Sequence, residues 1–166
     1  MKDINVSVLG HHGALHLQTH HATAKKEAFF QGYATHTYEN QDIYTGNWLN
    51  GMRDGYGILH RANNESYIGC WREDKFHGKG TYVFANRSVF DGTWHLGKRC
   101  GEGCLTTLTG ERYEGDWKDD MRHGYGVLLF ASGESYKGEW RNDKFHGQGQ
   151  FENDSECYYV GEFKEG

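Results

Sequence analysis

The stretch Tyr44-Thr-Gly-Asn-Trp48, followed seven residues later by Gly55-Tyr-Gly57, decides the fold of this chain. The same arrangement returns every 23 residues. All five tryptophans occupy the fifth position of a unit, at Trp48, Trp71, Trp94, Trp117 and Trp140. The units begin at Tyr44, Tyr67, Phe90, Tyr113, Tyr136 and Tyr159, and in the last one Phe163 replaces Trp. A period that holds without insertion or deletion predicts a solenoid of stacked supersecondary units.

Each unit has the pattern of a β-hairpin. In Tyr44–Trp48 the aromatic residues and Gly fall on one face of a strand, and Thr and Asn fall on the other. Asn50-Gly51 is typical of a turn. Gly55 and Gly57 then open a second strand on whose backbone an aromatic ring can lie, because Gly has no Cβ. We therefore expect one hairpin from each unit.

This pattern resembles the MORN repeat (membrane occupation and recognition nexus), whose consensus is near Tyr-x-Gly-x-Trp-x(6)-Gly-x-Gly. The resemblance covers about residues 29–166, with departures at Phe90 and Phe163, and at Cys100, where three other units carry His. The pattern and the resemblance together predict an all-β fold. It is a single-layer, elongated twisted sheet of stacked 23-residue β-hairpin (MORN-type) repeats.

The period also predicts how the chain is organised. Residues 1–28 form an amino-terminal polar, His-rich tail or cap, and residues 29–43 form a degenerate half-repeat in which Ala34 replaces the second Gly. Five full repeats follow at 44–66, 67–89, 90–112, 113–135 and 136–158, and then a partial sixth at 159–166. The partial repeat has no second strand, which favours either a fragment or an edge meant for a partner.

Composition narrows the class of protein. Among 166 residues there are 24 Gly, no Pro and 25 aromatics (Trp 5, Tyr 11, Phe 9), with a formal net charge of −5. Burial by aromatic rings over Gly argues against a helical bundle or a Rossmann-type sheet. The absence of an apolar run suited to a membrane span or a signal peptide predicts a cytoplasmic chain with reduced cysteines. A mildly acidic balance disfavours a nucleic-acid partner.

The titratable residues give little support for chemistry at a site. The histidines of the amino-terminal segment could place a metal ion on one helical face, but a polar tail is the better interpretation; they are His11, His12, His16, His20 and His21. His77, His123 and His146 recur one repeat apart, too far from each other to share a metal, and are interpreted as structural or surface residues. Carboxylates such as Glu114, Asp116 and Glu139 fall on the face away from Tyr and Trp, where a solvated face explains them. We therefore expect no enzyme activity, catalytic residue, metal or cofactor.

The aromatic face is the best candidate for a site, because a single-layer sheet has two faces and too little chain to cover both. An exposed groove of aromatic and apolar side chains is typical of protein interaction sites. The alternative is that the rings stack only on one another and that the amino-terminal segment occupies the face. The candidate groove residues are Tyr67, Trp71, Tyr82, Phe90, Trp94, Leu105, Tyr113, Trp117 and Leu128.

The function predicted from these features is a non-enzymatic scaffold or adaptor. Its groove would bind a helix or extended peptide of a cytoskeletal or ciliary protein, a cellular context that the family resemblance implies. Self-association through the sheet edge is a further possibility. The alternatives are a membrane- or phosphoinositide-targeting module, as the family name implies, and a regulatory repeat segment of a larger enzyme. Membrane lipid is disfavoured because the 15 basic and 19 acidic residues from Tyr44 onward are interspersed.

Overall fold

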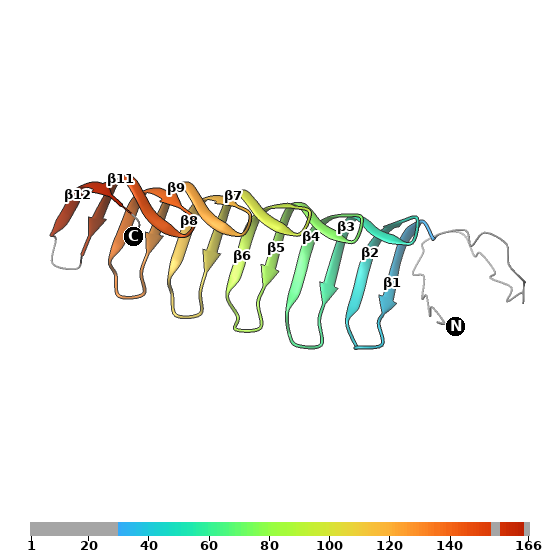
Figure 1. The fold of residues 1–166 in the computed structure, drawn as a ribbon. Coiled ribbons are helices and arrows are strands. Elements are labelled where there is room, and N and C mark those ends of the chain that lie inside the picture. Colours follow the sequence, from blue (N-terminus) through green and yellow to red (C-terminus); the bar gives the residue numbers. More distant parts are fainter. Residues whose placement is uncertain (1–29, 154–156, 165–166) are drawn as a thin grey trace, which may run out of the picture.

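The structure is a computed structural model that describes residues 30–153 and 157–164 of the chain. Twelve antiparallel strands form one open sheet, and their order in space follows the sequence (Figure 1). The described residues contain no helix. The strands are β1 (Gly32–Thr37), β2 (Ile43–Leu49), β3 (Met52–His60), β4 (Ser66–Arg72), β5 (Lys75–Val83), β6 (Val89–His95), β7 (Lys98–Thr106), β8 (Arg112–Lys118), β9 (Met121–Leu129), β10 (Ser135–Arg141), β11 (Lys144–Glu152) and β12 (Tyr158–Phe163). The predicted all-β, single-layer array of hairpins is confirmed.

Two kinds of turn alternate along the sheet, and they lie along opposite margins in Figure 1. The turn inside each hairpin has two residues with positive φ, as a type I′ turn requires. Asn50 and Gly51 have φ of 53° and 76°, and Asp119 and Asp120 have 50° and 71°. Five residues connect one hairpin to the next, and a hydrogen bond between the first and the fifth, as from the Thr107 N–H to the Glu111 carbonyl, closes a three-residue loop. The last residue of that loop is left-handed, such as Gly110 with φ 94°. Both turns match the right-handed twist of the strands they join.

Every hairpin carries a bulge at the same place. Between β2 and β3 the register runs Gly46↔Gly57 and then Trp48↔Arg53, so β3 contains two additional residues. Gly55, inside this bulge, has φ of 94°. A left-handed residue with a Cβ is unfavourable there, which explains the first Gly of each Gly-x-Gly.

The hairpins stack on one another beyond the bulge. The Asp74 N–H donates to the Arg53 carbonyl at 3.0 Å, and the Asp143 N–H donates to the Arg122 carbonyl at 3.0 Å. Each tight turn is therefore held by the hairpin before it. The buried residues form one continuous aromatic core on a single face of the sheet, which we call the inner face.

Candidate protein-interaction groove

The first aromatic residue of each repeat is held over two glycines. The Tyr67 ring covers Gly69 on its own strand and Gly80 on the next, and a methyl group at either Gly would overlap the ring. The Tyr67 hydroxyl donates to the Cys70 carbonyl at 2.8 Å. Tyr67 is 0% exposed, and its burial raises the pKa of the phenol well above its ordinary value. This tyrosine is a structural residue of the core.

The tryptophans join consecutive repeats into a ladder. The Trp71 ring centre lies 5.2 Å from that of Tyr67 in its own repeat and 5.2 Å from that of Tyr44 in the previous one, both in edge-on geometry. The Trp71 Nε1–H donates to the Gly57 carbonyl at 3.2 Å. Edge-on aromatic pairs are worth about 0.5–1.5 kcal/mol beyond their buried area. The ladder therefore couples each repeat to its neighbour.

The structure corrects the predicted exposure of the groove residues. Eight of the nine are 0–6% exposed, and Leu105 is half-buried against the same core. They pack on each other and on Gly, as in the alternative in which the rings only stack. The buried eight are Tyr67, Trp71, Tyr82, Phe90, Trp94, Tyr113, Trp117 and Leu128. In this fold they form the core of the inner face and present little surface to a partner.

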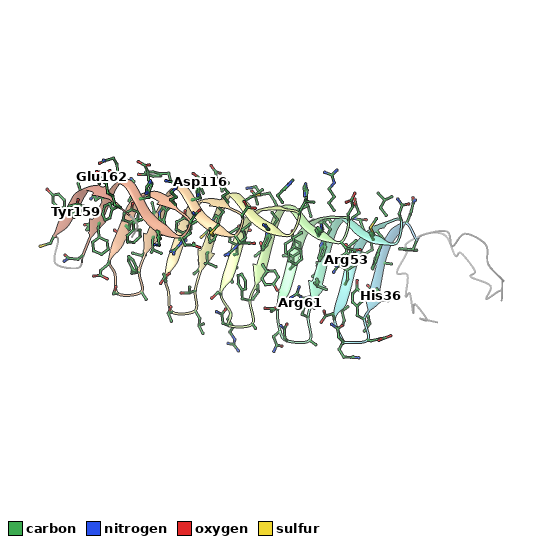
Figure 2. All side chains as sticks on the ribbon, in the orientation of Figure 1. His36, Arg53, Arg61, Asp116, Tyr159 and Glu162 are labelled. Carbon is green, nitrogen blue, oxygen red and sulfur yellow. The ribbon has the colours of Figure 1, made fainter. Side chains whose placement is uncertain are left out.

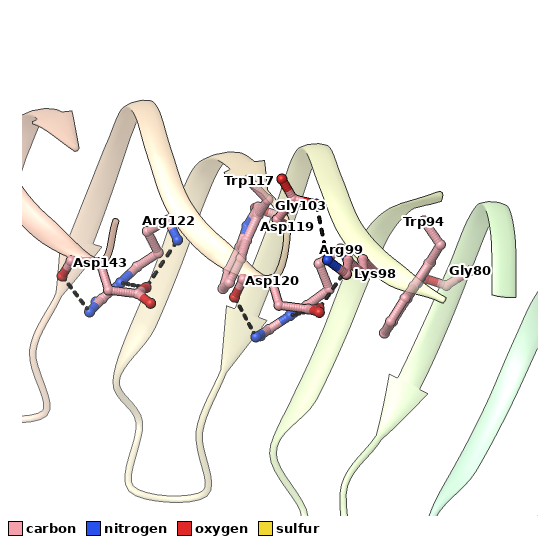
Figure 3. A network of polar contacts seen from close by, with 10 residues as sticks. All are labelled: Gly80, Trp94, Lys98, Arg99, Gly103, Trp117, Asp119, Asp120, Arg122 and Asp143. Atoms are coloured by element: carbon pink, nitrogen blue, oxygen red, sulfur yellow. Dashed lines mark hydrogen bonds and ion pairs between the residues drawn. The ribbon is translucent and has the colours of Figure 1, made fainter. Parts of the chain in front are cut away.

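An Arg–Asp contact clamps each of three hairpins to the next (Figure 3). Arg99 donates through Nε to Asp120 Oδ1 at 3.2 Å and through a terminal nitrogen to the Asp120 carbonyl at 2.7 Å. Its guanidinium carbon also lies 4.3 Å from the centre of the Trp117 ring. The other two clamps are Arg53 with Asp74 and Arg122 with Asp143. Each clamp arginine covers one face of a tryptophan ring.

In the second and fifth repeats a phenylalanine replaces the clamp arginine. Phe76 stacks on Tyr67 with ring centres 3.9 Å apart, and Phe145 stacks on Tyr136 in the same way at 3.9 Å. Gly97 stands where the clamps have Asp, and its N–H donates to the Phe76 carbonyl at 2.8 Å. The repeats thus use two interchangeable ways to close the inner face.

Among the described residues, the inner face is open at the amino-terminal end of the sheet. There a groove of about 1230 Å³ lies over β1, β2 and β3. Its apolar lining comprises Phe30, Tyr38, Trp48 and Leu59, and Trp48 is only partly buried. The half-repeat carries Ala34 and His36 where the next repeat has Gly57 and Leu59. The ladder therefore ends in this amino-terminal groove.

Polar groups lie at the border of the amino-terminal groove. His36 contacts Tyr38 edge-on, with ring centres 4.5 Å apart, and lies 6.0 Å from Trp48. Burial raises the pKa of Tyr38, while the charge of Arg53 opposes that shift. Arg53 and Arg61 add donors near the same end (Figure 2). Aromatic walls with a few convergent polar groups are typical of a ligand-binding site.

Sequence reasoning missed the clamps and the amino-terminal groove. The clamp has a signal, since Arg at the tenth position of a repeat recurs with Asp 21 residues later in Arg53/Asp74, Arg99/Asp120 and Arg122/Asp143. The groove has only the weak signal of Ala34 and His36 at positions where later repeats have Gly and a larger apolar residue.

The histidines and carboxylates considered in the sequence analysis can now be placed in the structure. Within residues 30–153 and 157–164 no three His, Cys, Asp or Glu side chains lie close enough to hold a metal ion. The five amino-terminal histidines and the 1–28 segment lie outside the described residues. His77 is half-buried and faces His95, with ring centres 5.1 Å apart. The carboxylates are on the predicted face, but Asp116 and Glu139 also accept the Tyr125 and Gln148 N–H at 3.0 Å.

Comparison with known families follows the same repeats. The MORN repeat family matches residues 44–66, 67–89, 90–112, 113–135 and 136–155. The chain belongs to the MORN repeat family. Each match begins at the aromatic residue that covers the paired glycines. The family motif therefore describes the aromatic ring over two glycines and the tryptophan ladder of the MORN units. A search of curated proteins found no match. No helix in the described part of this MORN chain is long and apolar enough to cross a membrane.

Two solved structures resemble the MORN array in outline. The first is the Drosophila melanogaster SAS-4 (dCPAP) TCP domain in complex with a proline-rich motif of Ana2 (dSTIL). It has 10% sequence identity, a TM-score of 0.49, and coverage of 88% of this chain and 85% of that chain. The second is the TCP10 domain of Danio rerio CPAP in complex with a peptide of STIL. It has 16% identity, a TM-score of 0.44, and coverage of 81% and 66%.

Proposed function

We propose that this MORN array is a non-enzymatic scaffold that binds an extended protein segment in its amino-terminal groove. The observation that carries the proposal is the partial burial of Trp48, whose counterparts Trp71, Trp94, Trp117 and Trp140 are 3–5% exposed. An aromatic side chain that is covered everywhere else and uncovered at one end favours occupation by another chain. The rigid sheet supplies the preformed walls that lower the entropic cost of binding.

The kind of occupant follows from the lining. Phe30, Tyr38 and Trp48 offer flat apolar surfaces, and the Arg53 and Arg61 side chains can donate to the carbonyl groups of an extended backbone. A cytoskeletal or ciliary partner in the cytoplasm is the finer part of the proposal, and it rests on the family resemblance alone. Membrane targeting is the second candidate; the interspersed charges of the array disfavour it.

A photo-crosslinking experiment tests the groove directly. A benzophenone amino acid replaces Tyr38 in one variant and Leu108 in a control variant, since Leu108 is 70% exposed in a turn far along the sheet. We expect a discrete protein cross-link from position 38 and none from position 108. Equal labelling at the two positions, or labelling of lipid at position 38, would contradict the proposal.

Affinity measurements then complete the test. A peptide that covers the cross-linked segment is titrated against Tyr38→Ser and against Phe130→Ser, a matched change at the equivalent position of the fourth repeat. Loss of a desolvated aromatic contact should weaken binding by about 2 kcal/mol for Tyr38→Ser. Phe130→Ser should leave binding unchanged. Co-sedimentation with anionic liposomes provides the comparison for the membrane alternative.

A further inference from the structure

The face opposite the aromatic core, which we call the outer face, has no second layer in the part of the chain that the structure describes. Strand register aligns its side chains in rows across the sheet. One row contains the pairs Thr35↔Thr45 and Thr45↔Ile58 and continues through Ile58↔Ile68. Most sheets bury one face on another layer, so the character of an uncovered outer face indicates what it meets.

The outer face of β1–β4 carries no charged side chain in its three rows between the bulge and the interhairpin loops. Large apolar residues on it are well exposed: Tyr33 is 59% exposed, Tyr56 is 53%, Ile43 is 40% and Ile68 is 40%. We call this the uncharged outer patch. Its members are Tyr33, Thr35, Thr37, Ile43, Thr45, Asn47, Tyr56, Ile58, His60, Ser66, Ile68 and Cys70.

From β6 onward the outer face carries carboxylates, interspersed with exposed apolar side chains such as Tyr125 (51% exposed), Leu129 (45%) and Val160 (63%). Glu102 on β7 lies directly opposite Asp116 on β8, a like-charge pair that destabilises a bare sheet. The carboxylates, which we call the acidic outer patch, are Asp91, Glu102, Glu114, Asp116, Glu139, Glu152 and Glu162. Arg112, in an ion pair with Glu114 at 2.7 Å, and Lys137 are the basic residues among them.

We propose that the outer face binds an α-helical segment of a partner protein that carries apolar side chains at one end and Lys or Arg at the other. The apolar end covers the uncharged outer patch, and the basic end neutralises the carboxylates around Glu102 and Asp116. This is a second surface, independent of the amino-terminal groove on the inner face. Charge complementarity fixes the orientation of the helix along the sheet.

Size and charge argue against a second copy of this chain as the occupant. Four strands at about 4.8 Å spacing and five residues at about 3.3 Å rise give roughly 300 Å² of flat patch. A stable interface needs about 800 Å² from each partner. Extending the contact between two copies would bring their acidic patches into it.

The distance between the two patches sets the length of the helix. The centre of the uncharged patch lies between β2 and β3, and the Glu102–Asp116 pair joins β7 and β8, which is five strand spacings or about 24 Å away. A helix rises about 1.5 Å per residue, so about 16 residues span this distance.

Designed helical peptides test the proposal with the full chain. The probe is a fluorescein-labelled 22-residue helix-forming peptide with a Leu/Ile stripe in its first half and Lys/Arg in its last half. Comparison peptides carry Gln or Glu in place of the basic residues. Fluorescence anisotropy at low and high salt should show binding of the basic peptide that weakens at least five-fold in high salt, and at least ten-fold weaker binding of the Glu peptide.

Matched protein variants locate the contact. Tyr56→Thr with Ile68→Thr should weaken binding at least ten-fold, and Glu102→Gln with Glu114→Gln should weaken it at least three-fold and reduce the salt dependence. Tyr125→Thr is the control: Tyr125 is 51% exposed on the same face, but its cross-strand neighbour is Glu139. We expect no change from it, and none from Tyr38→Ser in the groove.

Several results would overturn the proposal. They are the absence of binding of the basic peptide up to 500 µM, equal binding of the Gln and basic peptides, and equal weakening by Tyr56→Thr/Ile68→Thr and Tyr125→Thr. A dimer in light scattering that Tyr56→Thr dissociates would replace the helix with a second copy. Thermal unfolding of every variant confirms that the sheet is intact, so a folding defect is not read as lost binding.

Discussion

Arg99 lies against the face of Trp117, with its guanidinium carbon 4.3 Å from the ring centre, while its nitrogens hold Asp120 of the next turn. The arginine thus contacts the aromatic ladder and the neighbouring hairpin at once. Its side chain is 19% exposed, so the contact is largely shielded from water. The clamp is therefore a coupling device between repeats, and its strength should be measurable as stability.

Arg99→Lys should lower the free energy of unfolding by about 1–2 kcal/mol. Lysine keeps the charge but loses the planar stack on Trp117 and the paired donors to Asp120. Urea denaturation followed by tryptophan fluorescence measures the effect. Lys98→Ala is the matched control, because its ion pair with Asp119 has both side chains 58% exposed. It should change stability by less than about 0.5 kcal/mol, and equal losses would show that the stack contributes nothing.

The two ways of closing the inner face should be interchangeable as pairs. Phe76 with Gly97 occupies the places that Arg99 with Asp120 occupies one repeat later. Arg99→Phe alone leaves Asp120 without its guanidinium partner, whereas Arg99→Phe with Asp120→Gly reproduces the second repeat. A double-mutant cycle in urea should give a favourable coupling of about 1 kcal/mol. Additive losses would mean that neighbouring repeats do not sense which closure is used.

The glycines of the repeat should differ sharply in their tolerance of alanine. A Cβ at Gly115 would meet both the Gly126 backbone and the Tyr113 ring, so Gly115→Ala should cost about 3 kcal/mol or more. At Gly101 the nearest side-chain atom is 3.8 Å away and φ is +56°. Gly101→Ala should therefore cost only about 1 kcal/mol, from the left-handed backbone. Thermal melts of the two variants decide this, and similar losses would show that ring contact is not the reason for Gly115.

These glycines also show how far the sequence predicts the structure. Period two and the 23-residue repeat correctly predict the strands, their single-layer order and the Tyr ring over Gly. The glycine pattern predicts an aromatic ring over both glycines of Gly-x-Gly, but Gly101 and its counterparts serve the left-handed bulge instead. Each bulge adds two residues to one strand, so the alternation between inner and outer faces keeps its phase. The hydrophobic pattern therefore does not reveal the bulge.

The candidate site was less predictable than the fold. Alternation of apolar residues identifies which side chains share a face of the sheet. It does not show whether the aromatic rings on that face bury one another or leave surface for a partner. Trp94 is 5% exposed because the stacked rings of Tyr67 and Phe76 both pack against it, contacts that join three strands. Trp48 is the first tryptophan of the ladder, and its partial burial among the described residues becomes visible only in the three-dimensional stack.

The free energy of unfolding should fall at acidic pH, in part because Glu65 becomes protonated. This carboxylate accepts from Tyr82 at 2.8 Å and from Arg61 at 2.9 Å. Hydrogen bonding from Asn63, and then from Tyr82 and Arg61, lowers the pKa of Glu65 below its ordinary value of 4.5. Since the folded-state pKa is the lower one, the stabilisation is present above pH 4.5 and is lost as pH falls below it.

Glu65→Gln measures that contribution when urea midpoints are recorded at pH 7 and at about pH 3. The gap between wild type and variant should be largest at pH 7 and should close in acid. Glu134→Gln is the control, because Glu134 lies at the equivalent loop position three repeats later and accepts from Ser132 at 2.9 Å instead of from a tyrosine. A gap that stays constant with pH would rule out the ionised Glu65 as its source.

Trp94→Ala should destabilise the array more than Trp48→Ala. Trp94 contacts Phe90 at 5.2 Å in its own repeat and Tyr67 at 5.7 Å in the previous one, and its Nε1–H donates to Gly80 at 3.0 Å. Trp48 is only partly buried at the end of the ladder. Removing a buried Trp costs about 3–5 kcal/mol, and a central unit couples to neighbours on both sides. We expect the Trp48→Ala loss to be smaller by at least about 1 kcal/mol.

Trp94→Phe is the matched control: Phe163 takes the tryptophan position in the last unit, 5.2 Å from Tyr159 and 5.0 Å from Tyr136. It keeps the edge-on ring and loses the indole donor, so its loss should be about 1–2 kcal/mol. Equal urea midpoints for Trp94→Ala and Trp48→Ala would mean that the hairpins do not form a coupled linear stack.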